Sequence, residues 1–293
     1  MRPGREIRYR YRVSISPARA RSNYYFDAYN RIILDGTDSM LISHCLKLIV
    51  MKPPKTGGNT LFRRIRHLNE VSKFRVGMKY LQEIDETIWV GHITLQQFSK
   101  FRESEKTTDY RRVCFVRNPL DRVFSAYQTQ KETHMSRFDK GDPIRRIINE
   151  VDFNRFIRDN VDEDCIRRDV RFCHYRPLHE YTHYQGRNWM DFIGYNEKFE
   201  EDFDKLCRLF GLGDLKKVSK NVKTKPKPPC DPHYMQWENY KYLDKYERET
   251  VKLINELYAK DFEYFDYRIL DPEDFPEVLR PPRLSESVSR QHR

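Results

Sequence analysis

The sequence lacks the features that mark several large classes of protein. Among its 293 residues, no apolar run approaches the ~18 residues that a membrane-spanning helix requires. No secretory signal peptide is recognisable near Met1, and no N-x-[ST] glycosylation sequon occurs. The sequence therefore predicts no integral membrane span in this chain.

Cysteine pairs with the spacing of a metal site are also missing. The six cysteines stand at positions 45, 114, 165, 173, 207 and 230, and none forms a C-x-x-C pair. A structural zinc site is therefore not expected, and no ligand set for another metal is evident. Cys165 and Cys173 are near enough in sequence to pair in an oxidising compartment, so a disulfide and two free thiols both stay open.

Basic residues outnumber acidic ones. The 55 Lys and Arg against 44 Asp and Glu give a formal net charge of +11. Such an excess suits either a solvated basic surface or an anionic partner, which is a nucleic acid, an anionic glycan or a phosphorylated cofactor. No zinc-finger spacing and no RNP-like motif is present, so a nucleic acid is not expected. Hydrophobic residues make up 38% of the chain, enough for a packed core.

Composition divides the chain into three parts. Residues 1–40 are a basic N-terminal extension, in which the first 22 residues hold seven Arg and one Glu. Residues 41–270 carry the periodic apolar patterns of a single domain. Residues 271–293 are rich in Pro, Ser and charge, which predicts a flexible C-terminal tail.

Strand-like and helix-like patterns alternate within the central part. Apolar runs of strand length occupy 46–51, 87–92, 113–117 and 191–195. Helical patterns mark 61–68, 120–127, 199–213 and 234–260. This alternation predicts an α/β fold, with a P-loop-like, mainly parallel central sheet flanked by helices. Ligands of such sheets bind beyond the carboxyl ends of the strands, where Lys55, His92 and Arg117 are expected to emerge.

The segment VMKPPKTGGNTLFRRI (50–65) has the outline of a phosphate-binding loop between a strand and a helix. Its lysine precedes the glycines, so it is not the NTPase loop G-x-x-x-x-G-K-[ST]. Gly57 and Gly58 let backbone N–H groups approach an anion, and the positive end of the following helix adds to the attraction. Lys55 supplies a mobile charge. Side-chain hydrogen bonds are expected from Thr56, Asn59 and Thr60. Alone, the segment is explained equally well by a turn without a ligand.

A second segment, CFVRNPLDRVFSAY (114–127), places an arginine at a strand end and a serine in the next helix. Asn118 and Pro119 are good first residues for that helix. Residues 118, 121, 122 and 125 share one side of the helix start, so Arg117 and Ser125 can converge on a second phosphate. Taken alone, an arginine that caps a sheet end is the simpler interpretation.

Together the two segments resemble the sulfotransferase superfamily. The strand–PKTGG–helix element is similar to its 5′-phosphosulfate loop, and R-x-P-x-x-R-x-x-S is similar to its 3′-phosphate site. The resemblance implies the donor 3′-phosphoadenosine 5′-phosphosulfate (PAPS) as co-substrate and no metal. It assigns Lys55 through Thr60 to the 5′-phosphosulfate, and Arg117 and Ser125 to the 3′-phosphate.

Three further segments resemble the membrane-type carbohydrate sulfotransferases, in particular the uronyl 2-O and chondroitin-like branches. They are CHYRPLHEY (173–181), with Leu178 where glutamine is usual, DFIGYNEKFEEDFDKLCRLFGL (191–212) and YAKDFEYFDY (258–267). The resemblance spans 46–267 and implies a carbohydrate acceptor, with anionic polysaccharides among the candidates. The usual upstream anchor is not recognisable, so a cytoplasmic location is expected, with the Golgi lumen as the alternative if an anchor is missing from this sequence.

A histidine after the second predicted strand is the candidate general base. His92 in WVGHITLQQF resembles the histidine base of the uronyl 2-O branch, although a structural histidine fits the same pattern. Other branches use a carboxylate, so Glu83 and Glu86 are the fallback candidates. Three histidines in an aromatic stretch either line the acceptor pocket or pack in the core: His174, His179 and His183.

A lysine-rich segment, LKKVSKNVKTKPKPP (215–229), holds six lysines and no acid. Like-charge runs are usually solvated loops. The resemblance implies the alternative, a basic loop that contributes to the nucleotide site or borders an anionic glycan.

The implied reaction is an in-line sulfuryl transfer from PAPS to a sugar hydroxyl. His92 would take the hydroxyl proton, and Lys55 would stabilise charge on the leaving phosphate oxygen. Two alternatives remain: a P-loop-type kinase or other phosphotransferase, whose lysine and acidic Mg²⁺ ligands are not recognisable here, and a catalytically silent relative that binds an anionic glycan or a nucleic acid. The acceptor, its regiochemistry and the oligomeric state are left open.

Overall fold

The computed structural model describes residues 40–68, 70, 78–134, 142–212 and 241–273. The predicted N-terminal extension before residue 40, the tail beyond residue 273 and the lysine-rich segment 215–229 therefore lie outside the described residues. So do Cys230 and the first part of the helix predicted for 234–260.

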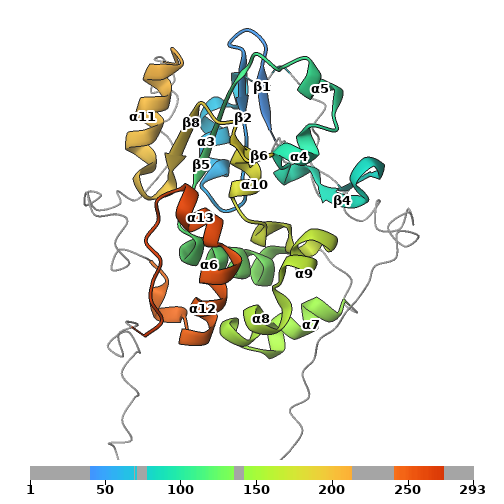
Figure 1. The fold of residues 1–293 in the computed structure, drawn as a ribbon, viewed down its shortest axis with the longest axis vertical. Coiled ribbons are helices and arrows are strands. Elements are labelled where there is room, and N and C mark those ends of the chain that lie inside the picture. The colour runs from blue at the N-terminus through green and yellow to red at the C-terminus, as the bar shows by residue number, and fades with distance from the viewer. Residues whose placement is uncertain (1–39, 69, 71–77, 135–141, 213–240, 274–293) are drawn as a thin grey trace, which may run out of the picture.

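A four-stranded sheet forms the centre of the fold, in the order β1–β2–β5–β8 (Figure 1). Its strands are β1 (Leu41–Ser43), β2 (Leu48–Val50), β5 (Arg111–Val116) and β8 (Phe192–Tyr195). β2, β5 and β8 are parallel, and β1 pairs antiparallel with β2 at one edge. The mainly parallel sheet and the strands predicted at 46–51, 113–117 and 191–195 are thus confirmed.

The strand predicted at 87–92 does not join this sheet. β4 (Glu86–Trp89) pairs antiparallel with β3 (Met78–Leu81) in a separate two-stranded ribbon, and Val90–His92 form a 3₁₀ turn. Asp85, in the left-handed conformation at φ 49°, closes the turn that reverses the chain between the two strands. An apolar run cannot distinguish a strand of the central sheet from one in a local hairpin, which is why the prediction was wrong here.

Both faces of the sheet are buried, and alternate residues of each strand enter different cores. Leu48 and Val50 of β2 join one cluster, and Ile49 joins the other. In β5, Phe115 lies in the first cluster and Val116 in the second. Burial on both faces explains why these strands read as continuous apolar runs in the sequence.

Different helices line the two clusters, and those of the larger cluster lie mostly beyond one end of the sheet (Figure 1). The smaller cluster lies under α3 (Gly58–Ile65) and α11 (Phe199–Leu209). The larger cluster involves α6 (Pro119–Thr129), α12 (Arg248–Leu257) and α13 (Ala259–Tyr264). The remaining helices are α4 (Leu95–Phe98), α5 (Arg102–Glu105), α7 (Pro143–Glu150), α8 (Phe153–Asn160), α9 (Glu163–Arg168) and α10 (His179–Thr182). A small ribbon joins β6 (His183–Tyr184) to β7 (Arg187–Asn188).

The start of α6 follows from its first residues. The Asn118 side chain accepts a hydrogen bond from the Asp121 backbone N–H at 2.7 Å, and Pro119 occupies the first helical position. Asparagine satisfies an otherwise unpaired N–H group there, and proline has no N–H to leave unpaired. The predicted helix start is therefore confirmed.

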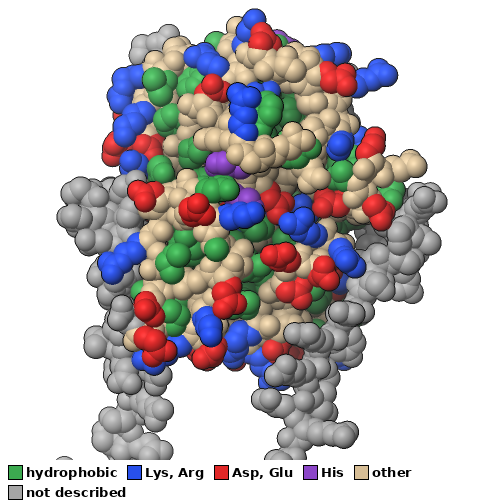
Figure 2. All heavy atoms as spheres, in the orientation of Figure 1, with side chains coloured by type: hydrophobic (Ala, Val, Ile, Leu, Met, Phe, Trp, Pro, Cys, Tyr) green, Lys and Arg blue, Asp and Glu red, His purple; other side chains and the backbone are tan. Residues whose placement is uncertain are grey.

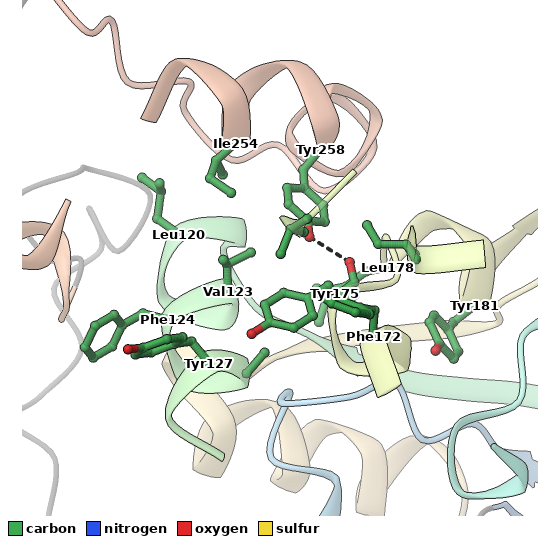
Figure 3. Packing of buried hydrophobic residues seen from close by; sticks show 14 of the residues in the cluster. Leu120, Val123, Phe124, Tyr127, Phe172, Tyr175, Leu178, Tyr181, Ile254 and Tyr258 are labelled. Atoms are coloured by element: carbon green, nitrogen blue, oxygen red, sulfur yellow. Dashed lines mark hydrogen bonds between the residues drawn. The ribbon is translucent and has the colours of Figure 1, made fainter. Parts of the chain in front are cut away.

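The helix predicted over 234–260 is divided in the part that the structure describes. A 3₁₀ turn (Leu243–Lys245) is followed by an extended Tyr246, and α12 ends before Tyr258. Tyr258 leaves the helical conformation, with φ −113° and ψ 22°, and begins α13 in a new direction. Its ring is fully buried and its hydroxyl donates to the Tyr175 carbonyl at 2.7 Å (Figure 3). Tertiary packing of this tyrosine therefore overrides a helical pattern that the sequence continues.

The two cysteines left open for pairing are free thiols. Burial raises the pKa of the Cys165 and Cys173 thiols to about 12. Thiols with raised pKa values are poor nucleophiles near neutral pH, so the structure offers no sign of a reactive pair.

A buried ion pair crosses the larger core. The Arg122 and Asp261 side chains, from α6 and α13, are both fully buried and lie 3.9 Å apart. The Arg122 guanidinium donates to the His174 carbonyl at 3.0 Å and lies 4.8 Å from the Tyr258 ring centre. Asp261 accepts hydrogen bonds from the backbone N–H groups of Leu178 and His179, at 2.7 and 2.8 Å.

We expect Asp261→Ala to destabilise the fold by about 3–5 kcal/mol, because it leaves the buried arginine without its counter-charge. Urea unfolding at neutral pH measures this. The matched control is Asp159→Ala, which breaks the surface ion pair with Arg155. The side chain of Arg155 is 52% exposed and that of Asp159 is 40% exposed. That variant should change stability by only about 0–1 kcal/mol. Equal losses for the two variants would contradict a central role for the buried pair.

Candidate active site

Hydrogen bonds hold the loop between β2 and α3 at its beginning, within the loop and at the start of α3. The Met51 N–H donates to the Val113 carbonyl of β5 at 2.9 Å, which keeps the strand pairing to its end. The Thr56 hydroxyl donates to the Pro53 carbonyl at 3.0 Å and is fully buried. Gly57, with φ 85°, accepts the first bonds of α3 from two backbone N–H groups. The loop is therefore fixed before any ligand arrives.

Lys55 has an unusual backbone conformation and a perturbed charge. Its φ of 64° lies in the left-handed region, which costs a non-glycine residue about 1–2 kcal/mol. Its ammonium donates to the Thr129 hydroxyl at the end of α6. Its pKa is lowered from the usual 10.5 to about 8, first by burial and then by the nearby positive charge of Arg117, whereas the charge of Glu132 opposes both effects. Strain of this kind is concentrated at functional sites.

Arg117 leaves β5 beside the same loop. Its guanidinium donates to the Lys55 carbonyl at 3.4 Å and lies 3.4 Å from the Asp121 carboxylate. The ring centre of Tyr242 lies 5.9 Å from it. Residues four apart share one side of a helix, so Ser125 lies on the side of α6 between Asp121 and Thr129. That side faces the loop, because those two neighbours contact Arg117 and Lys55.

His92 contacts the loop from the β4 side. Its Nδ1 lies 2.8 Å from the Lys52 carbonyl oxygen. A carbonyl can only accept, so Nδ1 carries the proton and Nε2 is the basic nitrogen. The His92 ring packs edge-on against the His174 ring at 5.0 Å between centres. This arrangement sets both the tautomer and the ring orientation that a general base requires.

The fallback carboxylates differ in their surroundings. Glu86 accepts from the Gln97 side chain at 2.8 Å and lies 3.6 Å from the Arg176 guanidinium. Glu83 lies exposed in the 3₁₀ turn Gln82–Ile84.

The three histidines of the aromatic stretch separate into two environments. His174 is buried against His92, whereas the side chains of His179 and His183 are partly exposed. His179 is bound to Asp261 at 2.9 Å, and the His183 ring packs on Tyr264 at 4.2 Å. Figure 2 shows histidine side chains near the middle of one face, over the region of α10 and β6, amid interspersed charges of both signs.

The structure thus brings together most of the residues predicted for the site. Lys55, Arg117 and the Ser125 side of α6 surround one loop, and His92 contacts the same loop at Lys52. Asn59 is exposed and Thr60 half-buried in the first turn of α3. The Thr56 hydroxyl is engaged with Pro53, so only its backbone N–H is offered to an anion.

Sequence reasoning missed several residues that complete this region. Thr129 binds Lys55, Asp121 pairs with Arg117, and Glu197 binds Asn118 at the start of α6. Asp121 and Thr129 were detectable from their helical spacing with Ser125. Glu197 was detectable only as the acid just after a predicted strand.

The described residues contain neither a metal-binding cluster nor a membrane-spanning helix. No cluster of three or more His, Cys, Asp or Glu side chains is arranged to hold a metal ion there. In the same ranges, no helix combines the length and the apolar character needed to cross a membrane.

Comparison with known proteins places this geometry in context. Residues 38–268 match the sequence model described as "Sulfotransferase family". An uncharacterized protein of Archaeoglobus fulgidus is 35% identical over 100 residues, which are 34% of this chain and 66% of that protein. The match thus spans just under two thirds of the length of that relative. No solved structure matches the chain significantly.

We expect Lys55→Met to stabilise the protein at pH 7. The folded-state pKa of Lys55, about 8, lies below the usual 10.5, so the folded state binds this proton more weakly than the unfolded state does. Removing the charge should therefore add about 1–3 kcal/mol below pH 8. The gain should shrink as the pH rises from about 8 toward 10.5, where the wild-type amine loses its proton.

Thermal unfolding at a series of pH values measures the effect. Lys100→Met, at an exposed position, is the matched control and should shift the melting temperature little at any pH. A gain for Lys55→Met that is independent of pH would show that the side chain's shape, and not its charge, is the cause.

Proposed function

Because the chain belongs to the sulfotransferase family, we propose that it transfers the sulfuryl group of PAPS to a hydroxyl of a carbohydrate acceptor. Membership of this family implies a transferase that acts on sulfuryl groups. The observation that carries the finer proposal is the convergence of Lys55, Arg117 and His92 on one strand-to-helix loop. PAPS carries anionic groups at both its 5′ and 3′ positions, and the two cations lie on adjoining segments of that loop region.

The proposed donor site has two parts. Backbone N–H groups of residues 55–59 at the start of α3 would hold the 5′-phosphosulfate, with the positive end of the helix favouring the anion. Side chains of Asn59 and Thr60 lie in the first turn of α3, where they can add hydrogen bonds. Arg117 and Ser125 would hold the 3′-phosphate, Arg117 through a charge-assisted contact.

Lys55 is proposed to stabilise the leaving group. In the transfer, an acceptor oxygen forms a bond to sulfur while the bond from sulfur to the 5′-phosphate oxygen breaks, and the electron pair stays on that oxygen. Lys55 is positioned at the loop that would hold this phosphate, and its lowered pKa makes it able to donate a proton or a strong hydrogen bond there. An arriving anion would also relieve the repulsion between Lys55 and Arg117.

His92 is proposed to take the acceptor proton. With its Nδ1 proton donated to the Lys52 carbonyl, the imidazole presents Nε2 as the base. The proton passes from the acceptor hydroxyl to Nε2, which leaves an imidazolium that the same carbonyl hydrogen bond supports. The carbohydrate nature of the acceptor is supported by the resemblance of the segments 173–181 and 191–212 to carbohydrate sulfotransferases, and a uronyl-containing polysaccharide is the first acceptor to test.

We predict that Arg117→Ala weakens the binding of adenosine 3′,5′-bisphosphate far more than that of adenosine 5′-phosphate. A lost charge-assisted hydrogen bond to the 3′-phosphate is worth about 1.5–3 kcal/mol. Isothermal calorimetry with both nucleotides, and with ATP as a third ligand, makes the measurement. Equal losses for both adenosine nucleotides would reject the assignment of Arg117, and ATP as the preferred ligand would favour a phosphotransferase.

For His92→Ala we predict a loss of turnover of about 10²–10⁴-fold with nearly unchanged donor affinity. Transfer of labelled sulfate from PAPS to a panel of polysaccharides, including uronyl-containing ones, gives the rate. The wild-type rate should also fall at acid pH, because protonation of Nε2 removes the base.

His44→Ala is the control, since His44 lies exposed in the turn between β1 and β2 and bonds to Tyr110. It should retain wild-type turnover. A purely structural His92 would instead lower the melting temperature and leave turnover per folded molecule intact, and the base would then be sought at Glu83 or Glu86.

A further inference from the structure

A short turn after β8 touches both segments of the proposed donor site. The 3₁₀ turn Asn196–Lys198 connects β8 to α11. A Cβ atom added at Gly57 would lie 2.5 Å from the Asn196 side-chain nitrogen and 3.5 Å from the Phe199 ring. The turn is thus packed directly against the phosphate-loop glycine, which cannot become alanine without moving it.

The next residue of this turn, Glu197, binds the second segment of the proposed donor site, at Asn118. One carboxylate oxygen accepts from the Asn118 backbone N–H at 2.8 Å and from the Asn118 side-chain amide at 3.0 Å. The other oxygen accepts from the Tyr267 hydroxyl at 3.0 Å. Burial raises the pKa of this carboxyl, while these hydrogen bonds and the charge of Arg117 oppose the rise.

These contacts fix the backbone from which Arg117 emerges. The Asn118 side chain is held at both ends, because its amide group donates to Glu197 and its oxygen accepts from the Asp121 N–H at 2.7 Å. The Asn118 backbone N–H is held as well, and it belongs to the peptide unit that joins Asn118 to Arg117. Rotation of that peptide would redirect the Arg117 side chain away from the loop.

We propose that Glu197 is a positioning residue that sets the direction of Arg117 and thereby the preference of the site for a nucleotide with a 3′-phosphate. This inference rests on the proposed function, since it needs Arg117 at the 3′-phosphate. Its role is to accept hydrogen bonds, and it does not touch the donor itself. A negative charge so near a phosphate would weaken binding, so only its geometry can favour the 3′-phosphate.

Two substitutions separate geometry from charge. Glu197→Gln keeps an oxygen that can accept both Asn118 bonds, and the Tyr267 hydroxyl can accept from the new amide group. Glu197→Leu has a similar size but no acceptor, and leaves the Asn118 donors unpaired. Asp142→Leu is the matched control: Asp142 is a buried acid that accepts from the Ile144 N–H and pairs with Arg171 at 2.8 Å, at the start of α7.

The readout is the ratio of two affinities measured by calorimetry on the full chain, for adenosine 3′,5′-bisphosphate and adenosine 5′-phosphate. An unfolded fraction changes the stoichiometry but not this ratio. We expect Glu197→Leu to lower the preference for the bisphosphate by about tenfold or more, and Glu197→Gln to stay within about threefold of wild type. Asp142→Leu should leave the ratio unchanged even where it lowers the melting temperature.

An unchanged ratio for Glu197→Leu, in a protein where Arg117→Ala abolishes the preference, would overturn this inference alone. So would a glutamine variant as impaired as the leucine one. If wild type shows no preference, or Arg117→Ala does not reduce it, the donor assignment fails and this inference fails with it. Should the leucine variant not fold, Asn118→Ser tests the same network, because serine keeps the helix cap and replaces the amide that reaches Glu197 with a shorter hydroxyl. Its ratio should fall, and an unchanged ratio would equally reject the inference.

Discussion

The buried pair of Arg122 and Asp261 is the constraint on which the larger half of the fold depends. Both charges are surrounded by protein, and both contact backbone groups of one segment: the Arg122 guanidinium donates to the His174 carbonyl, and Asp261 accepts from the Leu178 and His179 N–H groups. Breaking a buried pair leaves an uncompensated charge in a medium of low polarity, which is far more costly than losing a surface pair. The pair therefore locks α6, the 174–179 segment and α13 into one arrangement.

This arrangement positions the helix and the segment that carry side chains of the candidate site. α6 carries Arg122 on its buried side and Ser125 and Thr129 on the side that faces the loop, so a helix held by the ion pair also holds these two side chains beside the loop. The 174–179 segment brings the His174 ring against His92. The geometry of the candidate site is thus largely a consequence of core packing, to which the loop adds a few hydrogen bonds of its own.

The site keeps two positive charges close together, although Asp121 lies 3.4 Å from Arg117 and the charge of Glu132 acts on Lys55. Lys55 is partly buried beside Arg117, which lowers its pKa, and its backbone adopts a left-handed conformation without being glycine. Both features oppose folding, and evolution retains such costs where a ligand or a reaction requires them. An anion that binds between these charges would turn the repulsion into attraction, which is the physical reason for proposing an anion site at this loop.

The sequence by itself determined the local chemistry: the glycines and lysine of the loop at 55–58, the capped helix start at Asn118, and three strands of the parallel sheet. These are set by short-range properties, namely backbone freedom, capping and apolar runs, which a local pattern records. Only the tertiary structure decided that residues 86–89 leave the central sheet, that the last helix divides at Tyr258, and that Glu197 reaches back to Asn118. Each of these depends on partners distant in the chain, and a single sequence carries no record of which distant residue a buried hydroxyl or carboxylate will meet.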